Sequence, residues 1–388
     1  MKKLIYFLVF VLTTNFAFSK WSQLTNGLGY GLVYSVAVSG NNAFVGTFNK
    51  GVYSSTDLGN NWNPTNLNSN NVISLTISGN SLIAGTDENG IFISTNNGQS
   101  WSNTLTTGSI NSFAISGNKI YAGGHKEVYV STNNGSSWTE INTEYDLTIS
   151  DIKVKGNLII ISSSIGVLIS SDNGNSWEQY NDGFDDLNVS TLAVNQNKIF
   201  AGTSGGGIYL STDDGNSWTK KTEINTLNIT TLLAYGNNVF AGTFNNNVYF
   251  SSDNGNSWTK KDNGLNNPST RFLTIGGDYI FAATDGGVYR SKLSDLTSTD
   301  VNDEIKKNDI FLINPNPASD FIEISGFEDR SDFLKDDFSI KIYNTIGECV
   351  LFDKQNQNAG TIRLNIDFLA KGFYYLKIGN LIEKFIKL

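Results

Sequence analysis

Residues 170–177 read SSDNGNSW, and the same eight letters return at residues 251–258. Four related copies are STDLGNNW (55–62), STNNGQSW (94–101), STNNGSSW (131–138) and STDDGNSW (211–218). Successive copies end 39, 37, 39, 41 and 40 residues apart, at Trp62, Trp101, Trp138, Trp177, Trp218 and Trp258. A period of about 40 residues predicts a propeller or another repeat array.

The sequence between two motifs predicts β-strands. Residues 110–131 contain INSFAIS, KIYAGG and EVYVS, three short runs of β-forming residues separated by Gly and Asn. The residues after each tryptophan supply a fourth strand. Helical periodicity is absent from the repeats, so this all-β pattern of four-stranded units favours a β-propeller over a sandwich or a solenoid.

The two ends of the repeat region complement each other. Trp21 lies 41 residues before Trp62 and opens the strand-like segment WSQL. At the far end, residues 271–275, 280–284 and 287–291 predict three strands with no tryptophan after them. Joined, these pieces make one further blade, close the ring and leave no blade with an open sheet edge at the seam. The sequence therefore predicts a seven-bladed β-propeller with 1+3 strand closure over residues 20–294.

The third motif position indicates what the motif does. Four copies have an aspartate there and two have an asparagine: Asp57, Asn96, Asn133, Asp172, Asp213 and Asp253. Asparagine keeps a carbonyl acceptor but cannot act as a general base or nucleophile. We therefore expect this position to accept hydrogen bonds within a turn, and the tryptophan to pack against the outer side of its blade.

A calcium loop is an alternative reading of the Asp, Asn and Gly in the motif. A calcium loop of the EF-hand type needs a bidentate acid at its twelfth position, and that position varies among the copies. A site of His and Cys ligands is also disfavoured, because the chain has one histidine, His125, and one cysteine, Cys349. We expect no metal, no cofactor and no intrachain disulfide.

The spacing Ser-x-Asp-x-Gly-x-x-Trp resembles the Asp-box, or BNR, repeat of sialidases and of many non-enzymatic propellers. The resemblance covers residues 21–294. It implies that the motif lies in the hairpin between the third and fourth strands of a blade, away from the ligand-binding face. A sialidase also needs a cluster of arginines for the substrate carboxylate, and the propeller region contains only Arg271 and Arg290.

Charge limits the partners. The net charge is -9 and the pI is near 4.7, so the chain repels phosphate backbones and nucleic acid is not expected as a partner. The repeats also resemble those of the photosystem II assembly factor propellers. That resemblance would imply a basic arginine patch, which this acidic chain lacks.

The first 19 residues predict a secretory signal peptide. Lys2 and Lys3 precede an apolar run over residues 4–12, and Ala17 and Ser19 occupy the -3 and -1 positions of a cleavage site. The alternative is a transmembrane anchor, but the apolar run is shorter than the roughly 20 residues needed to span a bilayer. We expect no transmembrane segment in the mature chain.

The C-terminal region differs from the repeats. Residues 295–310 are polar and lack glycine, which indicates a linker, and residues 311–388 alternate in hydrophobicity like a small β-sandwich. Residues 315–319, 343–347, 369–374 and 384–388 resemble the type A sorting domain of the type IX secretion system of Bacteroidota. The resemblance implies a secreted or outer-membrane cell-surface protein and the secretion machinery as a partner. A generic sugar-binding β-domain is the alternative.

Function is expected where the repeats disagree. The loops between the second and third strands, and those before each first strand, should crown one mouth of the propeller channel. Their predicted ligand-binding residues are Phe48, His125, Tyr145, Phe184, Phe244, Arg271 and Asp285. Asp87, Glu88 and Glu127 are the best catalytic acids available, on neighbouring blades.

The sequence thus predicts a binding or interaction module for a glycan or a protein. The alternative is a glycoside hydrolase that acts on a polysaccharide. Exposed acids on short loops are usually solvated surface, and related xyloglucan hydrolases use two facing propellers where this chain has one, so a binding role is favoured.

Overall fold

The computed structural model describes residues 21–29, 31–68, 70–221, 224, 228–244, 248–266, 269–297, 312–325, 338–344, 348–355, 361–378 and 381–388. The chain divides into two compact units, residues 1–299 and 300–388. The predicted signal peptide, 1–19, lies outside the described residues, as does the predicted linker from residue 298 on.

The described part of the first unit contains seven four-stranded antiparallel sheets, here numbered 1 to 7. Sheet 1 has β2 (Val33–Ser39), β3 (Asn42–Thr47), β4 (Gly51–Ser55) and β5 (Asn63–Pro64). Sheet 2 has β6 (Val72–Ser78), β7 (Ser81–Thr86), β8 (Ile91–Ser94) and β9 (Ser102–Leu105). Sheet 3 has β10 (Ile110–Ser116), β11 (Lys119–Gly124), β12 (Glu127–Ser131) and β13 (Thr139–Asn142).

Sheet 4 has β14 (Asp151–Lys155), β15 (Leu158–Ser163), β16 (Gly166–Ser170) and β17 (Glu178–Gln179). Sheet 5 has β18 (Val189–Asn195), β19 (Lys198–Thr203), β20 (Ile208–Ser211) and β21 (Thr219–Lys220). Sheet 6 has β22 (Ile229–Tyr235), β23 (Asn238–Thr243), β24 (Val248–Ser251) and β25 (Thr259–Lys260). Sheet 7 has β26 (Thr270–Gly276), β27 (Tyr279–Thr284), β28 (Gly287–Lys292) and, from the start of the chain, β1 (Ser22–Gln23).

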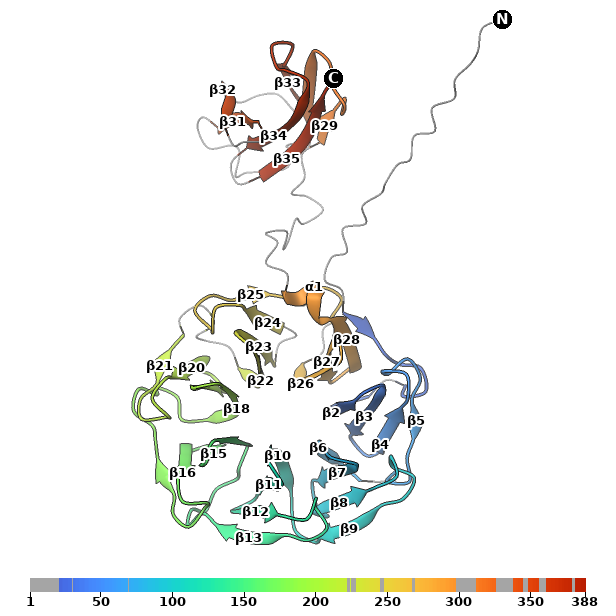
Figure 1. Ribbon diagram of the computed structural model, residues 1–388, viewed down its shortest axis with the longest axis vertical. Coiled ribbons are helices and arrows are strands. Elements are labelled where there is room, and N and C mark those ends of the chain that lie inside the picture. Colours follow the sequence, from blue (N-terminus) through green and yellow to red (C-terminus); the bar gives the residue numbers. More distant parts are fainter. Residues whose placement is uncertain are drawn as a thin grey trace, which may run out of the picture. The chain divides into compact units, whose positions relative to one another are not determined.

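The sheets form a ring with the first strand of each facing the centre (Figure 1), which confirms the predicted β-propeller. The second strands of five sheets carry a glycine just before their last residue, where they lie close to the next sheet. A Cβ on Gly46 would lie 2.5 Å from the carbonyl oxygen of Val72, and one on Gly85 would lie 2.6 Å from that of Ile110. A side chain at Gly46 or Gly85 would clash with the next sheet, whereas sheets 4 and 7 accommodate Ser162 and Ala283 at the same position.

The ends of the first unit meet in sheet 7. Ser22 pairs with Arg290 and Gln23 with Tyr289, so β1 completes the sheet that β26, β27 and β28 begin. The backbone N–H of Trp21 donates to Asn263 in sheet 6, as Trp62 donates to Asn26 and Trp218 to Asp182 in their preceding neighbours. Trp21 thus makes in sheet 7 the contact that the motif tryptophans make in sheets 1 and 5.

Three of the motif tryptophans pack between neighbouring sheets. Trp62, Trp177 and Trp218 are buried in clusters that join their own sheet to the preceding one, while Trp101, Trp138 and Trp258 are half-buried. Each of these three buried rings therefore stabilises a junction between two sheets. This follows from the twist of the sheets, which leaves a wedge to fill at the wide outer end.

A short helix follows sheet 7. Helix α1 (Leu293–Thr297) buries Leu296 in the cluster that holds Trp21 and Tyr289. Residues 295–297, which the sequence assigned to a linker, are thus packed onto the propeller.

The second unit has two sheets. One contains β29 (Leu312–Asn314), β30 (Phe321–Ser325) and β33 (Thr361–Asn365), and the other contains β31 (Phe338–Tyr343), β32 (Cys349–Gln355), β34 (Gly372–Ile378) and β35 (Leu381–Lys387). Ile322, Ile342, Leu376 and Phe385 are fully buried in a single cluster, as expected of a small β-sandwich. Among the described residues, no helix is long and apolar enough to cross a membrane.

Candidate functional site

The six motifs form the same turn between the third and fourth strands. In each, the first serine hydroxyl donates to Oδ1 of the third residue over 2.7–2.9 Å. The backbone N–H of the seventh residue donates to the same oxygen over 2.9–3.0 Å. The motif glycine N–H donates back to the serine hydroxyl, which closes the turn.

Asparagine and aspartate are interchangeable in this turn because both present Oδ1 to it. They differ only in the other terminal atom, which is Nδ2 in asparagine and Oδ2 in aspartate. In Asn96 the Nδ2 group donates to the Ser100 hydroxyl over 2.9 Å. In Asp172 the Oδ2 atom instead accepts from the Ser176 hydroxyl over 2.7 Å. A serine hydroxyl can do either, so both versions are satisfied. The motif is structural, and its aspartates face the backbone of their own turn.

These turns lower the pKa of their aspartates. The Asn61 side chain and then Ser55 donate to Asp57 and lower its pKa to about 2. The side chain and backbone of Ser176, followed by Ser170, lower the pKa of Asp172 to about 2. Hydrogen-bond donors lower the pKa of a carboxyl group because they stabilise its ionised form. Neither carboxylate is therefore suited to act as a general base near neutral pH.

The opposite ends of the sheets form a second surface, here called the loop face. It carries the connections between second and third strands, and in five sheets this connection is hydrogen-bonded to the segment entering the same sheet. Backbone N–H groups donate from Phe48 to Leu32, from Asp87 to Asn71, from Ser204 to Asn188, from Phe244 to Asn228 and from Asp285 to Ser269, over 3.0–3.2 Å. The loops between second and third strands and the loops before each first strand were predicted to lie together at one end of the propeller channel. In five sheets they are hydrogen-bonded to each other.

Four side chains on the loop face come together where sheet 7 meets sheet 1. Arg271 Nε lies 2.5 Å from Asp285 Oδ1 within sheet 7. The Arg271 guanidinium also lies 5.6 Å from the ring centre of Tyr34, whose ring packs edge-on against Phe48 at 6.5 Å. We call Tyr34, Phe48, Arg271 and Asp285 the loop-face cluster. Three of its members were predicted, and Tyr34 was missed.

Tyr34 and Arg271 occupy the same repeat position, a bulge at the start of the first strand. At that position Asn111, Ser190 and Thr230 donate to a backbone carbonyl of the next sheet. Tyrosine and arginine replace these short polar side chains at the two first strands that flank the closure. The comparison of repeats could have indicated Tyr34 as a departure from the small polar residues of sheets 3, 5 and 6, although sheet 2 also departs there, with Ile73.

Electrostatics extends the cluster to sheet 2. Partial burial raises the pKa of Tyr34, Arg271 lowers it, and the carboxylates of Asp87 and Asp285 raise it. Asp87 therefore acts on Tyr34 through its charge, although its own hydrogen-bond donor is the Ser109 hydroxyl at 3.3 Å. The cavity below Phe48 has a volume of only about 20 Å³. A ligand here would contact a surface, since pockets for small molecules typically hold about 300–1,000 Å³.

The other predicted ligand-binding residues lie apart from this cluster. His125 Nδ1 is 3.0 Å from the Thr148 hydroxyl, and Tyr145 packs at the edge of the core between sheets 3 and 4. Phe184 is half-buried, with its ring centre 4.5 Å from Tyr209 and 4.9 Å from Trp218. Phe244 is 50% exposed and belongs to sheet 6, so it lies on the other side of sheet 7 from Phe48.

The candidate catalytic acids lack a common arrangement in the described part of the chain. Glu88 is exposed, and Glu127 is half-buried at the start of β12, where its charge raises the pKa of Tyr129 after the larger effect of burial. No hydrogen bond or ion pair among the described residues links Asp87, Glu88 and Glu127. Within the same residues, no group of three or more His, Cys, Asp or Glu side chains is placed to hold a metal ion.

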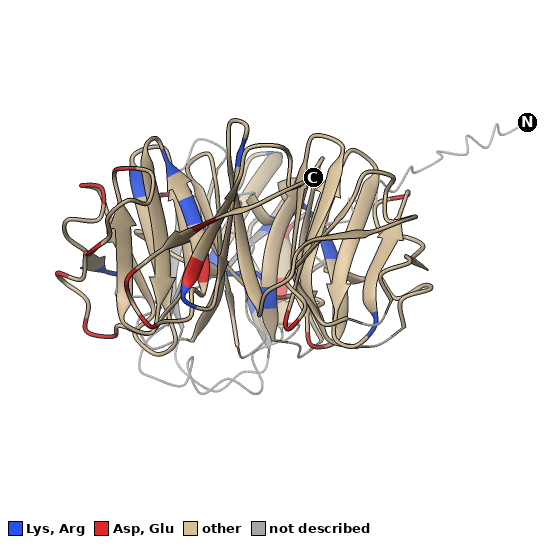
Figure 2. Cartoon of the chain, turned by 90° about the horizontal axis from the view of Figure 1, so that it is seen from below, with Lys and Arg blue, Asp and Glu red and all other residues tan. Residues whose placement is uncertain are grey.

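Charged residues of both signs are interspersed around the described part of the ring (Figure 2). Several acids near the loop face are engaged by the protein itself. Asp185 pairs with Lys220 at 2.7 Å, and Asp186 accepts from the N–H groups of Gly205 and Gly206 at 2.9 and 2.8 Å. These two acids therefore hold loops in place.

The fold and the second unit together define a β-propeller followed by a sorting domain. The chain belongs to the family of the DUF6242 beta propeller domain, whose model matches residues 9–113 and 154–272, more than half of the chain. The model of the secretion system C-terminal sorting domain matches residues 312–387. This confirms the predicted type IX sorting domain, and with it export to the cell surface or secretion. No curated protein matches the chain by sequence.

Solved structures share the fold at low identity. A YCF48 structure with a bound D1 peptide is 17% identical, with a TM-score of 0.61, over 73% of this chain and 98% of that one. PorZ, a surface component of the type IX secretion system of Porphyromonas gingivalis, is 15% identical, with a TM-score of 0.57, over 94% and 60%. The GH74 enzyme of Niastella koreensis is 20% identical, with a TM-score of 0.52, over 69% and 43%.

Proposed function

We propose that this exported propeller is a binding module whose ligand contacts the loop-face cluster, and that the ligand is a polypeptide. The observation that carries the proposal is the cluster itself, with Arg271 held between Asp285 and Tyr34 beside the exposed ring of Phe48. Aromatic and arginine side chains dominate the energetics of protein interfaces.

Three further observations support a polypeptide over a small molecule. Phe48 and Phe244 are 46% and 50% exposed on sheets 1 and 6, either side of sheet 7. The cavity below Phe48 is too small for a ligand to enter. In addition, a propeller of the same fold has been solved with a bound peptide. A glycan ligand remains the alternative binding role.

A peptide array probed with the exported chain tests this role. We expect Arg271→Ala and Phe48→Ala to weaken peptide binding by about tenfold or more, as for hot-spot side chains. Tyr235→Ala is the matched control, because Tyr235 is an equally exposed aromatic, 52%, at the other end of its sheet. Equal effects of all three variants would contradict the proposal.

The hydrolase alternative has its own test. Sugar release from polysaccharides by the wild type, abolished in Glu88→Gln, would favour a glycoside hydrolase over a binding module. The sorting role of residues 312–388 is tested by their deletion, which should retain the propeller inside the cell envelope. Undiminished export of the truncated chain would contradict that role.

A further inference from the structure

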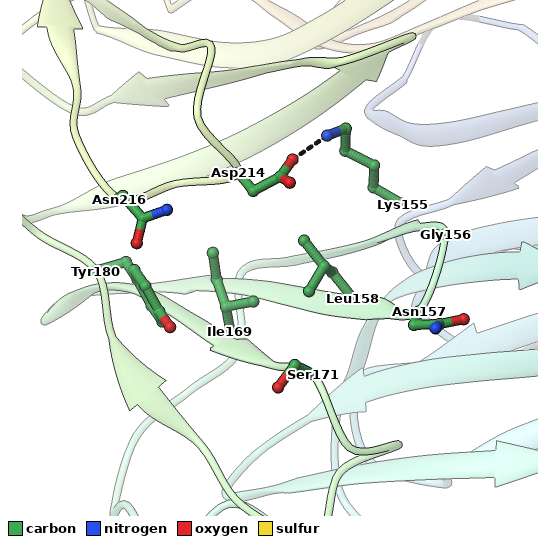
Figure 3. A pocket seen from close by; sticks show the side chains of 9 residues that line it. All are labelled: Lys155, Gly156, Asn157, Leu158, Ile169, Ser171, Tyr180, Asp214 and Asn216. Atoms are coloured by element: carbon green, nitrogen blue, oxygen red, sulfur yellow. Dashed lines mark hydrogen bonds and ion pairs between the residues drawn. The ribbon is translucent and has the colours of Figure 1, made fainter.

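A hollow lies between sheets 4 and 5, at the end of the ring that carries the Asp-box turns. Its volume is about 510 Å³, within the range of about 300–1,000 Å³ typical of small-molecule sites. Sheet 4 lines it with residues 155–158, Ile169, Ser171 and Tyr180, and sheet 5 lines it with Asp214 and Asn216. Figure 3 shows Ile169 and Leu158 pointing from sheet 4 toward the loop that carries Asp214 and Asn216.

Tyr180, the aromatic residue of the lining, is the third residue after the motif tryptophan Trp177. At three junctions, the residue third after the motif tryptophan lies against the glycine of the next Asp-box turn: Leu24 against Gly59, Thr65 against Gly98, and Ile141 against Gly174. At the junction of sheets 4 and 5, the atoms nearest Gly215 are those of Ile169 and Trp218 instead. The junctions of sheets 2 and 3 and of sheets 5 and 6 share this arrangement, since Gly135 and Gly255 also meet other residues. Tyr180 packs partly against the cluster that joins sheets 4 and 5 and lines the hollow with the rest of its ring.

The lining combines an aromatic ring with polar groups that can serve a ligand. The Tyr180 hydroxyl donates to Glu178 over 3.2 Å, which fixes one edge of the ring. The side chains of Asn157 and Ser171 are exposed and have no hydrogen-bond partner among the described residues. Asn216 is exposed across from them and can accept through its side-chain carbonyl.

The charges at the hollow cancel. Lys155 Nζ and an Asp214 carboxylate oxygen form an ion pair that spans from the hairpin of sheet 4 to the turn of sheet 5 (Figure 3). Both charged groups in the lining are thus paired with each other, so the site offers little to a charged ligand. An aromatic face, amide and hydroxyl groups and a neutral balance suit a sugar ring, which has apolar C–H faces and hydroxyl edges.

We propose that this hollow binds a neutral sugar unit of a glycan. The site is separate from the loop-face cluster, because the first-strand hairpins and the Asp-box turns lie at the opposite ends of the sheets from the loops that carry that cluster. A chain with both sites would hold a glycan on one face and its polypeptide ligand on the other.

The test uses the exported chain on an array of neutral glucan, mannan, galactan and xylan oligosaccharides. We expect the wild type to bind at least one of them, and Tyr180→Thr to weaken that binding by about tenfold or more. Threonine is the natural residue at this repeat position in sheets 1 and 2, as Thr65 and Thr104, so the variant should fold. Lys221→Thr, the same position in sheet 5, is the matched control and should bind like the wild type.

Two further variants keep the outcome decisive. Asn157→Ala changes only an exposed hairpin tip and should also weaken binding, even if Tyr180→Thr were to fold poorly. Phe48→Ala should leave glycan binding unchanged, whereas it weakens peptide binding. The proposal is overturned if no neutral oligosaccharide binds, if Tyr180→Thr and Asn157→Ala bind like the wild type, or if Phe48→Ala alone abolishes glycan binding.

Discussion

The Asp-box turns and the loop face show opposite uses of the same repeat. All six turns keep three hydrogen bonds within narrow distances, even where asparagine replaces aspartate. On the loop face the backbone bonds repeat while the side chains differ from sheet to sheet. Invariance among the copies therefore marks what folding requires, and divergence marks where a ligand can be recognised.

Among residues that serve folding, the buried tryptophans should have the largest effect on the free energy of unfolding. Trp21 is 1% exposed, and its Nε1 donates to the Lys261 carbonyl over 2.8 Å. Trp21→Ala should lower the free energy of unfolding by about 3–5 kcal/mol, measured by urea denaturation. Trp258→Ala, at a half-buried ring, should cost less. If both variants lost the same free energy of unfolding, the position of Trp21 at the ring closure would add nothing to its contribution to stability.

Single turns give an intermediate effect. Asp253 accepts hydrogen bonds from Ser251, Ser257 and the backbone of its turn. Asp253→Ala removes the acceptor and should lower the melting temperature by about 2–4 °C, whereas Asp253→Asn should stay close to the wild type at pH 7. A matching loss in the asparagine variant would show that the turn needs charge after all.

The pH dependence separates the aspartate turns from the asparagine turns. The folded-state pKa values of Asp57 and Asp172 are about 2, below the value of about 3.9 for an unfolded chain. Their stabilisation is therefore complete above about pH 4 and is lost as the pH falls from about 4 to 2. The double variant Asp57→Asn, Asp172→Asn should lose less stability over this window, as followed by circular dichroism during acid titration. An unchanged acid midpoint would refute the assignment.

The loop face should give the smallest effect on stability. Phe48 is 46% exposed, so Phe48→Ala should change the free energy of unfolding by no more than about 0.5 kcal/mol. The same variant should weaken peptide binding, measured by titration of an array-selected peptide. A large loss of stability would place Phe48 among the residues that hold the ring together.

The sequence predicted the propeller because each repeat carries its own turn residues and strands. It also predicted the joining of Trp21 to the last three strands, since the missing fourth strand could be counted. Tyr34 escaped prediction because Arg271 is brought to it from the other end of the propeller by ring closure, and because a strand bulge sets where its side chain lies. The burial of Phe184 and the space beside Tyr180 depend on packing between sheets, which repeat spacing does not reveal.

The pairing of β1 with β28 has a consequence for the order of folding. The side chain of Gln23 bonds to Gly286 across 263 residues of sequence, and Arg290 reaches back to Leu58 across 232. The other six sheets are local hairpin arrays that can form as soon as their own residues are available. Contacts between residues this far apart in the sequence form slowly, because a long loop must be closed first. Closure of the ring is thus the step expected to limit the folding rate, and until it occurs the edge of β28 stays open to pairing with other chains.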